Sequence, residues 1–95
     1  MRNVKININD STGATISIAS DASRNELIIR NGPTSDTVWL AFNESAVSQQ
    51  GIYLQAGDAI IFNSSKQDRK TRATANVYMV TDVGGSAEVF ADITS

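Results

Sequence analysis

Acidic side chains are the main candidates for chemistry in this chain of 95 residues, because the sequence contains no histidine and no cysteine. Acid–base and nucleophilic catalysis usually depend on a histidine, an activated cysteine or a pair of tuned carboxylates. The 10 acidic residues fall mostly at expected turns and strand ends, where hydrogen bonding to nearby backbone N–H groups explains them. No spacing among them requires a catalytic pair. We therefore expect that the protein is not an enzyme.

A metal centre of the usual kind is also excluded by composition. The stretch "GIYLQAGDAIIF", residues 51–62, resembles the hairpin with which cupin enzymes present histidines to a metal, but thiolate and imidazole ligands are absent. Oxygen ligands for calcium occur in residues 7–13 and 64–68, without the order of an EF-hand loop, so Asx turns are the simpler interpretation. No cofactor is predicted. A cupin-like enzyme is the least favoured of the three functions considered for this chain.

The elements that would position any site are predicted to be β-strands. Polar and apolar residues alternate with period two, and Val, Ile, Thr, Tyr and Phe fill the alternating runs. Alternation places Val4, Ile6 and Ile8 on one face of the first strand, opposite Lys5 and Asn7. In the next strand it places Ala14, Ile16 and Ile18 inward. The expected strands are residues 4–8, 14–19, 26–30, 37–42, 51–55, 59–63, 75–81 and 87–93.

The runs at 26–30 and 37–42 are more continuously apolar, as expected for strands covered on both sides. In the hairpin, Gly57 and Asp58 are expected to form a tight turn. Residues 43–50 could form one helical turn with Asn43 as its N-cap. Four side chains of the hairpin are expected in the core: Ile52, Leu54, Ile60 and Phe62.

Turn residues separate the strands at the spacing of a sandwich or a barrel. We predict an all-β fold, an antiparallel β-sandwich of about eight strands with jelly-roll-like topology, formed by one domain over residues 1–95. No segment approaches the ~20 apolar residues of a membrane span, and the start has no apolar run typical of a signal peptide. A soluble protein made in a cytosol is expected.

The charge pattern disfavours nucleic acid as a partner. The formal net charge is −2, whereas a nucleic-acid-binding domain normally has a basic surplus. Half of the positive charges lie in residues 63–72, which could contact an acidic protein surface or could simply form a solvated loop. The four basic residues of this segment are Lys66, Arg69, Lys70 and Arg72.

Two aromatic residues are candidates for binding. Alternation places Trp39 on the face of Thr37 and Ala41, away from the core face of its strand, and it points Tyr53 away from Ile52 and Leu54. Both side chains could anchor a protein interface or stack on a sugar. The competing interpretation is that both faces of the Trp39 strand are buried.

The order of segments is specific enough to resemble a known group. "SRNELIIRN" at 23–31 is followed by "TVWLAFNESAV" at 37–47, by residues 51–62, by "ANVYMV" at 75–80 and by "GGSAEVFADI" at 84–93. This order is similar to that of small tailed-bacteriophage virion β-sandwich proteins, of the head decoration (cement), head-fibre or tail-associated type, and it covers residues from about 20 onward. By resemblance, one framework set forms a central strand: Arg24, Leu27, Ile28, Ile29 and Asn31. A second set forms the hairpin: Gly51, Ile52, Leu54 and Gly57.

The resemblance implies a non-enzymatic structural virion protein, and the leading hypothesis is a capsid decoration (cement) protein that binds the exterior of a phage head and stabilises capsomer junctions. It implies the major capsid protein or another virion protein as partner, a homotrimer, synthesis in the bacterial host cytoplasm, and no nucleic-acid or membrane partner. The alternative is a carbohydrate- or receptor-binding domain of a fibre or tail component, with Trp39 and Tyr53 stacking on sugars. The partner-binding residues expected for the decoration protein are Val4, Lys5, Ile6, Trp39, Tyr53, Lys66, Arg69, Lys70 and Arg72.

Overall fold

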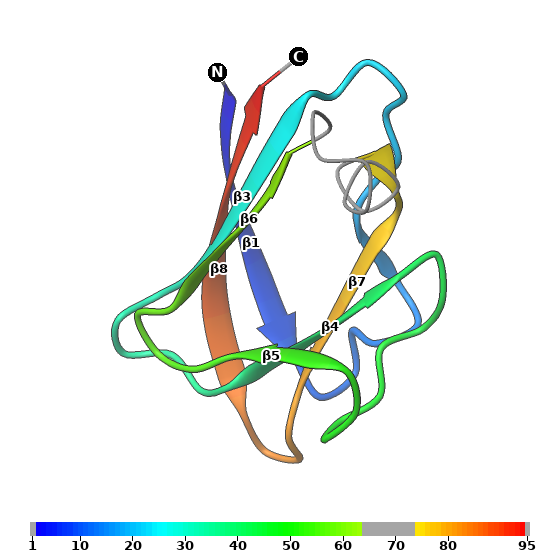
Figure 1. Cartoon of the computed structure of the whole chain (residues 1–95). Coiled ribbons are helices and arrows are strands. Elements are labelled where there is room, and N and C mark those ends of the chain that lie inside the picture. Colours follow the sequence, from blue (N-terminus) through cyan, green and yellow to red (C-terminus); the bar gives the residue numbers. More distant parts are fainter. Residues whose placement is uncertain (1, 64–73, 95) are drawn as a thin grey trace.

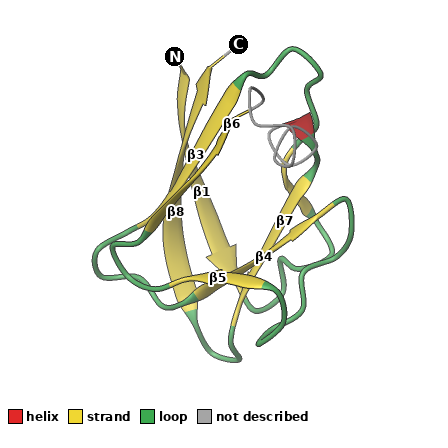
Figure 2. Cartoon of the chain, in the orientation of Figure 1, coloured by secondary structure: helices red, strands yellow, loops and turns green. Residues whose placement is uncertain are grey.

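The computed structural model describes residues 2–63 and 74–94, and these residues fold into two packed β-sheets (Figures 1 and 2). Every strand expected from the alternation is present. Their bounds are β1 Arg2–Asn9, β2 Ile16–Ile18, β3 Glu26–Asn31, β4 Val38–Phe42, β5 Ile52–Leu54, β6 Ala59–Asn63, β7 Val77–Thr81 and β8 Ser86–Thr94.

The strand order is that of a jelly roll. Sheet A has the order β1-β8-β3-β6 and sheet B the order β2-β7-β4-β5, with antiparallel neighbours throughout. The first strand pairs with the last, the second with the seventh, the third with the sixth and the fourth with the fifth. This is the pairing of one long hairpin that is wound into two layers. The predicted all-β sandwich is therefore confirmed. Because β1 pairs with β8, the two ends of the described chain lie side by side (Figure 1).

The core lies between the sheets and is built from alternate residues of the strands. Leu27 and Ile29 of β3 belong to the same core cluster as Val38 and Leu40 of β4, and all four are buried. Phe42 and Phe62 meet edge to face across the layers, with ring centroids 5.0 Å apart. In the "GIYLQAGDAIIF" stretch the predicted core set is confirmed. Leu54 and Phe62 are buried, and Ile52 and Ile60 are partly buried against them.

The inward prediction for the segment before β2 is wrong at two positions. Ile18 is buried, but Ile16 is 46% exposed and Ala14 is also exposed. The register shifts between Ile16, which pairs with Tyr78, and Ile18, which pairs with Val77. An irregularity of this kind turns Ile16 to the outer face and leaves only Ile18 in the core.

The prediction that β3 and β4 are covered on both sides is also wrong. Ile28 is only half-buried on the outer face of β3, and Arg30 is exposed. On the outer face of β4, Trp39 and Ala41 are half-buried. Each strand has one face in the core and one toward solvent, because in the described part of the chain no third layer packs over either sheet.

The stretch from 51 to 62 is not a hairpin. Its two strands, β5 and β6, belong to different sheets, so the turn between them carries the chain from one layer to the other. Gly57 has a φ of 81° in this turn, and its N–H donates to the carbonyls of Asn31 and Gly32. The Gly-rich turn at 82–85 joins β7 and β8 across the layers in the same way. Jelly-roll winding places sequential strands in opposite sheets here, which alternation alone does not reveal.

Residues 43–50 contain no helix, contrary to the helical turn considered for them. Asn43 has a φ of 61°, and its side-chain oxygen accepts the N–H of Asn76 instead of capping a helix. Ala46 donates its N–H to the carbonyl of Gly13, so the segment packs against the turn after β1.

Two buried polar side chains hold the ends of the sandwich together. The guanidinium of Arg24 donates to the carbonyls of Ala19 and Ala75, which joins the chain after β2 to the chain before β7. At the other end, the amide of Asn31 donates to the carbonyls of Asp36 and Leu54. Both residues were expected in the strand at 23–31; Asn31 is the last residue of β3, whereas Arg24 lies before β3, so that part of the prediction is wrong.

Candidate functional site

The expected contact residues divide between the two layers. Val4, Lys5 and Ile6 lie on β1 in sheet A, whereas Trp39 and Tyr53 lie on β4 and β5 in sheet B. The structure therefore brings the two aromatic residues together but not the aromatic pair and β1. Lys66, Arg69, Lys70 and Arg72, predicted from the basic segment, lie outside the described residues.

Trp39 and Tyr53 form an aromatic pair on the outer face of sheet B. They are register partners on β4 and β5, with ring centroids 5.1 Å apart and planes tilted by 48°. Tyr53 is 54% exposed, while Trp39 is half-buried. Within the described chain the buried indole Nε1 of Trp39 has no hydrogen-bond partner. The pair presents an aromatic platform on the outer face of sheet B, exposed mainly through Tyr53.

A hollow of about 580 Å³ is lined by residues that follow Trp39 on β4 and by Ile52, which precedes Tyr53 on β5. Ala41, two residues after Trp39 and on the same face of β4, lines it together with the segment that links β4 to β5. Glu44 and Gln50 contribute a carboxylate and an amide to its wall. Trp39 and Tyr53 do not line this hollow, so a ligand that used both features would have to extend from the aromatic pair past Ala41 to Glu44 and Gln50.

The outer face of sheet A carries a second patch, which sequence reasoning missed. Cross-strand register places Phe90 of β8 between Lys5 of β1 and Arg30 of β3. In the next row Ile28 lies beside Ile61 of β6, which is 51% exposed. Alternation through "AEVFADI" already turns Phe90 away from the core face of Val89 and Ala91, and that was the signal available in the sequence.

Charged groups surround this apolar centre. Lys5 Nζ lies 3.4 Å from Glu88 Oε1, and Arg30 Nη2 lies 3.8 Å from Asp92 Oδ2. Asn3 also donates its side-chain amide to Asp92. Such exposed pairs contribute about 0–1 kcal/mol each to stability. Their arrangement around the apolar residues, with both signs of charge present, is the composition of a protein interface with an apolar centre and a polar rim.

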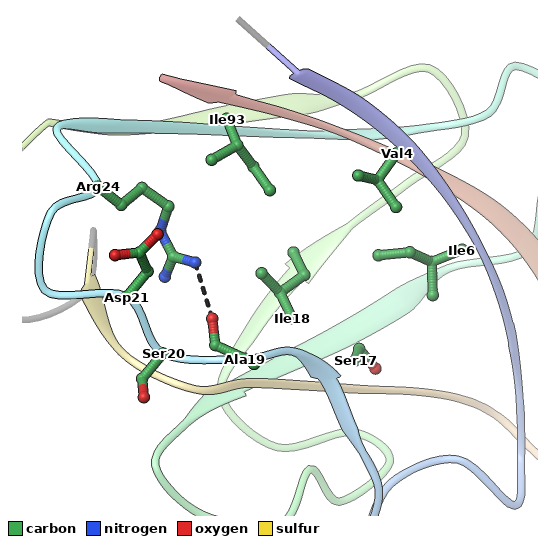
Figure 3. A pocket seen from close by; sticks show the side chains of 9 residues that line it. All are labelled: Val4, Ile6, Ser17, Ile18, Ala19, Ser20, Asp21, Arg24 and Ile93. Carbon is green, nitrogen blue, oxygen red and sulfur yellow. Dashed lines mark hydrogen bonds between the residues drawn. The ribbon is translucent and has the colours of Figure 1, made fainter. Parts of the chain in front are cut away.

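A cavity of about 320 Å³ opens at one side of the sandwich, between the edge strands β1 and β2 (Figure 3). Val4 and Ile6 of β1 face Ile18 across it, and Ile93 of β8 closes its inner side. Arg24 lies at one end, where it donates to the carbonyl of Ala19. The cavity explains why Val4 and Ile6 are only partly buried although they face the core.

No group of three or more acidic side chains in the described residues is arranged to hold a metal ion. In the same residues, no helix is long and apolar enough to cross a membrane. The surfaces described above are therefore the features from which a function can be argued.

No protein-family model matches the chain, and no curated protein matches it.

Proposed function

We propose that this chain is a non-enzymatic structural protein of a bacteriophage virion, which binds the exterior of the head and reinforces the junctions between capsid subunits. The resemblance of residues 20–95 to small virion proteins supports the class of protein. The jelly-roll sandwich is compatible with that class, although many unrelated functions use the same fold. The homotrimer implied by the resemblance stays a prediction, which sedimentation equilibrium would test.

The outer face of sheet A is the surface that we propose contacts the capsid, because of its composition. Phe90, Ile28 and the exposed Ile61 form an apolar centre on the outer face of sheet A, and charged residues surround them. A standard interface buries roughly 800 Å² on each partner. Burial of that kind stabilises a shell by mass action when the protein binds assembled capsid subunits and not separated ones, and several copies add avidity.

The test compares two variants of equal charge for binding to undecorated capsids of the phage that encodes the chain. Ile61→Glu places a carboxylate in the centre of the patch, whereas Val83→Glu changes a residue that is 93% exposed in the turn between β7 and β8. In co-sedimentation, Ile61→Glu should weaken binding at least about tenfold, which corresponds to ~1.4 kcal/mol. Val83→Glu should bind like the parent protein. Equal binding by both variants would show that this face is not the contact.

A glycan-binding module is the second candidate, supported by the aromatic pair and the hollow that Ala41 lines. Trp39 is the only tryptophan, so its fluorescence reports directly on this face. Under this alternative, oligosaccharides change the fluorescence saturably, and Tyr53→Ala weakens binding while it keeps the fluorophore. Saturable sugar binding that is lost in Tyr53→Ala, together with unchanged capsid binding by Ile61→Glu, would favour this function over the first.

A further inference from the structure

We infer that the edge of β1 and the cavity beside it form a binding site for an extended peptide segment of a partner protein, added to sheet A as a further strand. The inference does not depend on the virion proposal, since it rests on the backbone of β1 and the cavity alone. The segment it predicts has apolar residues at alternate positions, with an acidic residue between two of them.

The hydrogen bonds of β8 determine which backbone groups of β1 point toward sheet A and which point away from it. On β8, Glu88 directs its N–H to Ser35 Oγ and accepts the N–H of Gly32, so its backbone faces the β3 side. Backbone groups alternate along an antiparallel strand, so Val89 and its odd-numbered neighbours face β1. Their partners on β1 are the even-numbered residues, including Ile6 opposite Val89.

The odd-numbered residues of β1 therefore direct their N–H and C=O groups outward, away from sheet A. Asn9 agrees, because its N–H and C=O meet the side chain and N–H of Thr12 at the end of the strand. Asn3, Lys5 and Asn7 thus present a row of backbone donors and acceptors along an edge strand. Such a row is the template that strand addition uses.

Apart from the charged Lys5, this edge has none of the irregularities that usually protect edge strands. β1 has eight residues, a continuous register with β8 and no proline. On sheet B, by contrast, the edge strands β2 and β5 have three residues each, and β2 has an irregular register. β1 is therefore long and regular enough to pair with another chain.

The cavity supplies a place for the side chains of an added strand. A strand beside β1 places alternate side chains next to Val4 and Ile6, over Ile18, in the opening of about 320 Å³. Val4, Ile6 and Ile18 are apolar and select apolar residues at this part of the opening, while Ser20, Asp21 and Arg24 give the opening a polar end. The intervening side chains lie on the outer face beside Lys5, where a carboxylate opposite a lysine is favoured.

A single extended segment fits this opening better than a second copy of the chain. β1 packs across the core against β7, and β2 is the edge of the opposite layer at the same side. If a second copy paired its own β1 here, its β2 would meet the same opening that β2 of the first copy already borders. An extended segment has no second layer and meets no such obstacle.

The test measures amide hydrogen exchange by NMR on the full chain, with and without a blocked synthetic peptide in which valine alternates with threonine around one central glutamate. In the free protein the amides of Lys5 and Asn7 should exchange quickly, while those of Val4 and Ile6 are protected by β8. Saturating peptide should slow exchange at Lys5 and Asn7 at least tenfold and leave Val4 and Ile6 unchanged. A peptide with lysine in place of the glutamate should bind more weakly.

Two variants at one position give the matched control. Lys5→Pro removes an outward N–H without removing a bond to β8, so it should abolish peptide binding while Trp39 fluorescence stays that of the folded protein. Lys5→Ala keeps the N–H and should still bind. Absence of any exchange change at Lys5 and Asn7 would overturn the inference. A second result would also overturn it: slow exchange of the Lys5 and Asn7 amides in the free protein, together with a dimer in sedimentation equilibrium. A second copy of the chain would then occupy the edge of β1.

Discussion

Replacing Asn31 with alanine removes the amide that ties the loop after β3 to the end of β5. Asn31 is 1% exposed, and its Nδ2 donates to Asp36 O at 2.9 Å and to Leu54 O at 3.0 Å. The backbone bonds of Asn31 to Asp58 and Gly57 do not involve the amide and remain possible in the variant. The substitution therefore isolates the side-chain ties.

The expected loss follows from the surroundings of each carbonyl. Leu54 is buried, so its carbonyl loses its donor without access to water, at a cost of about 1–3 kcal/mol. Asp36 is exposed, so water can replace the lost bond and only about 0.5–1.5 kcal/mol is at stake. Asn31 Oδ1 has no partner among the described residues, and removing this buried acceptor recovers about 1 kcal/mol. The net loss is about 2 kcal/mol by the same estimates.

Thermal unfolding followed by circular dichroism measures this loss. For a domain of this size about 1 kcal/mol shifts Tm by about 4–8 °C, so Asn31→Ala should lower Tm by roughly 8–16 °C. Gln55→Ala, an amide deletion at an exposed position next to Leu54, is the control and should change Tm little. If Asn31→Ala unfolds at the temperature of Gln55→Ala, the two ties do not stabilise the fold and the reasoning is refuted.

Two further substitutions test the packing of the loops. In Gly13→Ala the new Cβ would lie 2.4 Å from the carbonyl oxygen of Ala46, so the two segments must move apart. The midpoint of urea unfolding should fall by the equivalent of about 1–3 kcal/mol. An unchanged midpoint would contradict this contact. Arg24→Met keeps most of the side-chain volume but leaves the buried Ala75 carbonyl without its donor, so we expect a loss of about 1–3 kcal/mol in urea unfolding. Arg24→Lys should restore only part of it, because an ammonium cannot bridge Ala19 and Ala75 as the guanidinium does; full restoration would argue against the bridge.

The strands could be predicted from the sequence because alternation is a local signal. Each run of alternating residues gave a strand, and the core residues Leu54 and Phe62 followed from their parity. Ile16 shows where parity fails, since one register irregularity turns it to the outer face while Ile18 stays in the core. Which sheet a strand joins depends on pairing across the chain, so the winding that separates β5 from β6 was not visible in the turn residues.

The candidate site was only partly predictable for the same reason. Trp39 and Tyr53 were each expected to face outward, but their contact depends on the pairing of β4 with β5. The patch around Phe90 joins residues from β1, β3, β6 and β8, whose order in sheet A follows from the fold alone. The cavity beside β1 likewise exists only because two edge strands of different sheets face each other.

Electron cryomicroscopy of undecorated capsids mixed with the purified protein tests the central proposal most directly. The account predicts added density on the outside of the shell at subunit junctions, with the outer face of sheet A, including Phe90 and Ile61, turned toward the capsid. Capsids that show no added density at saturating protein would contradict the proposal of a decoration protein. Density that contacts the shell only through Trp39 and Tyr53 would contradict the proposed docking face.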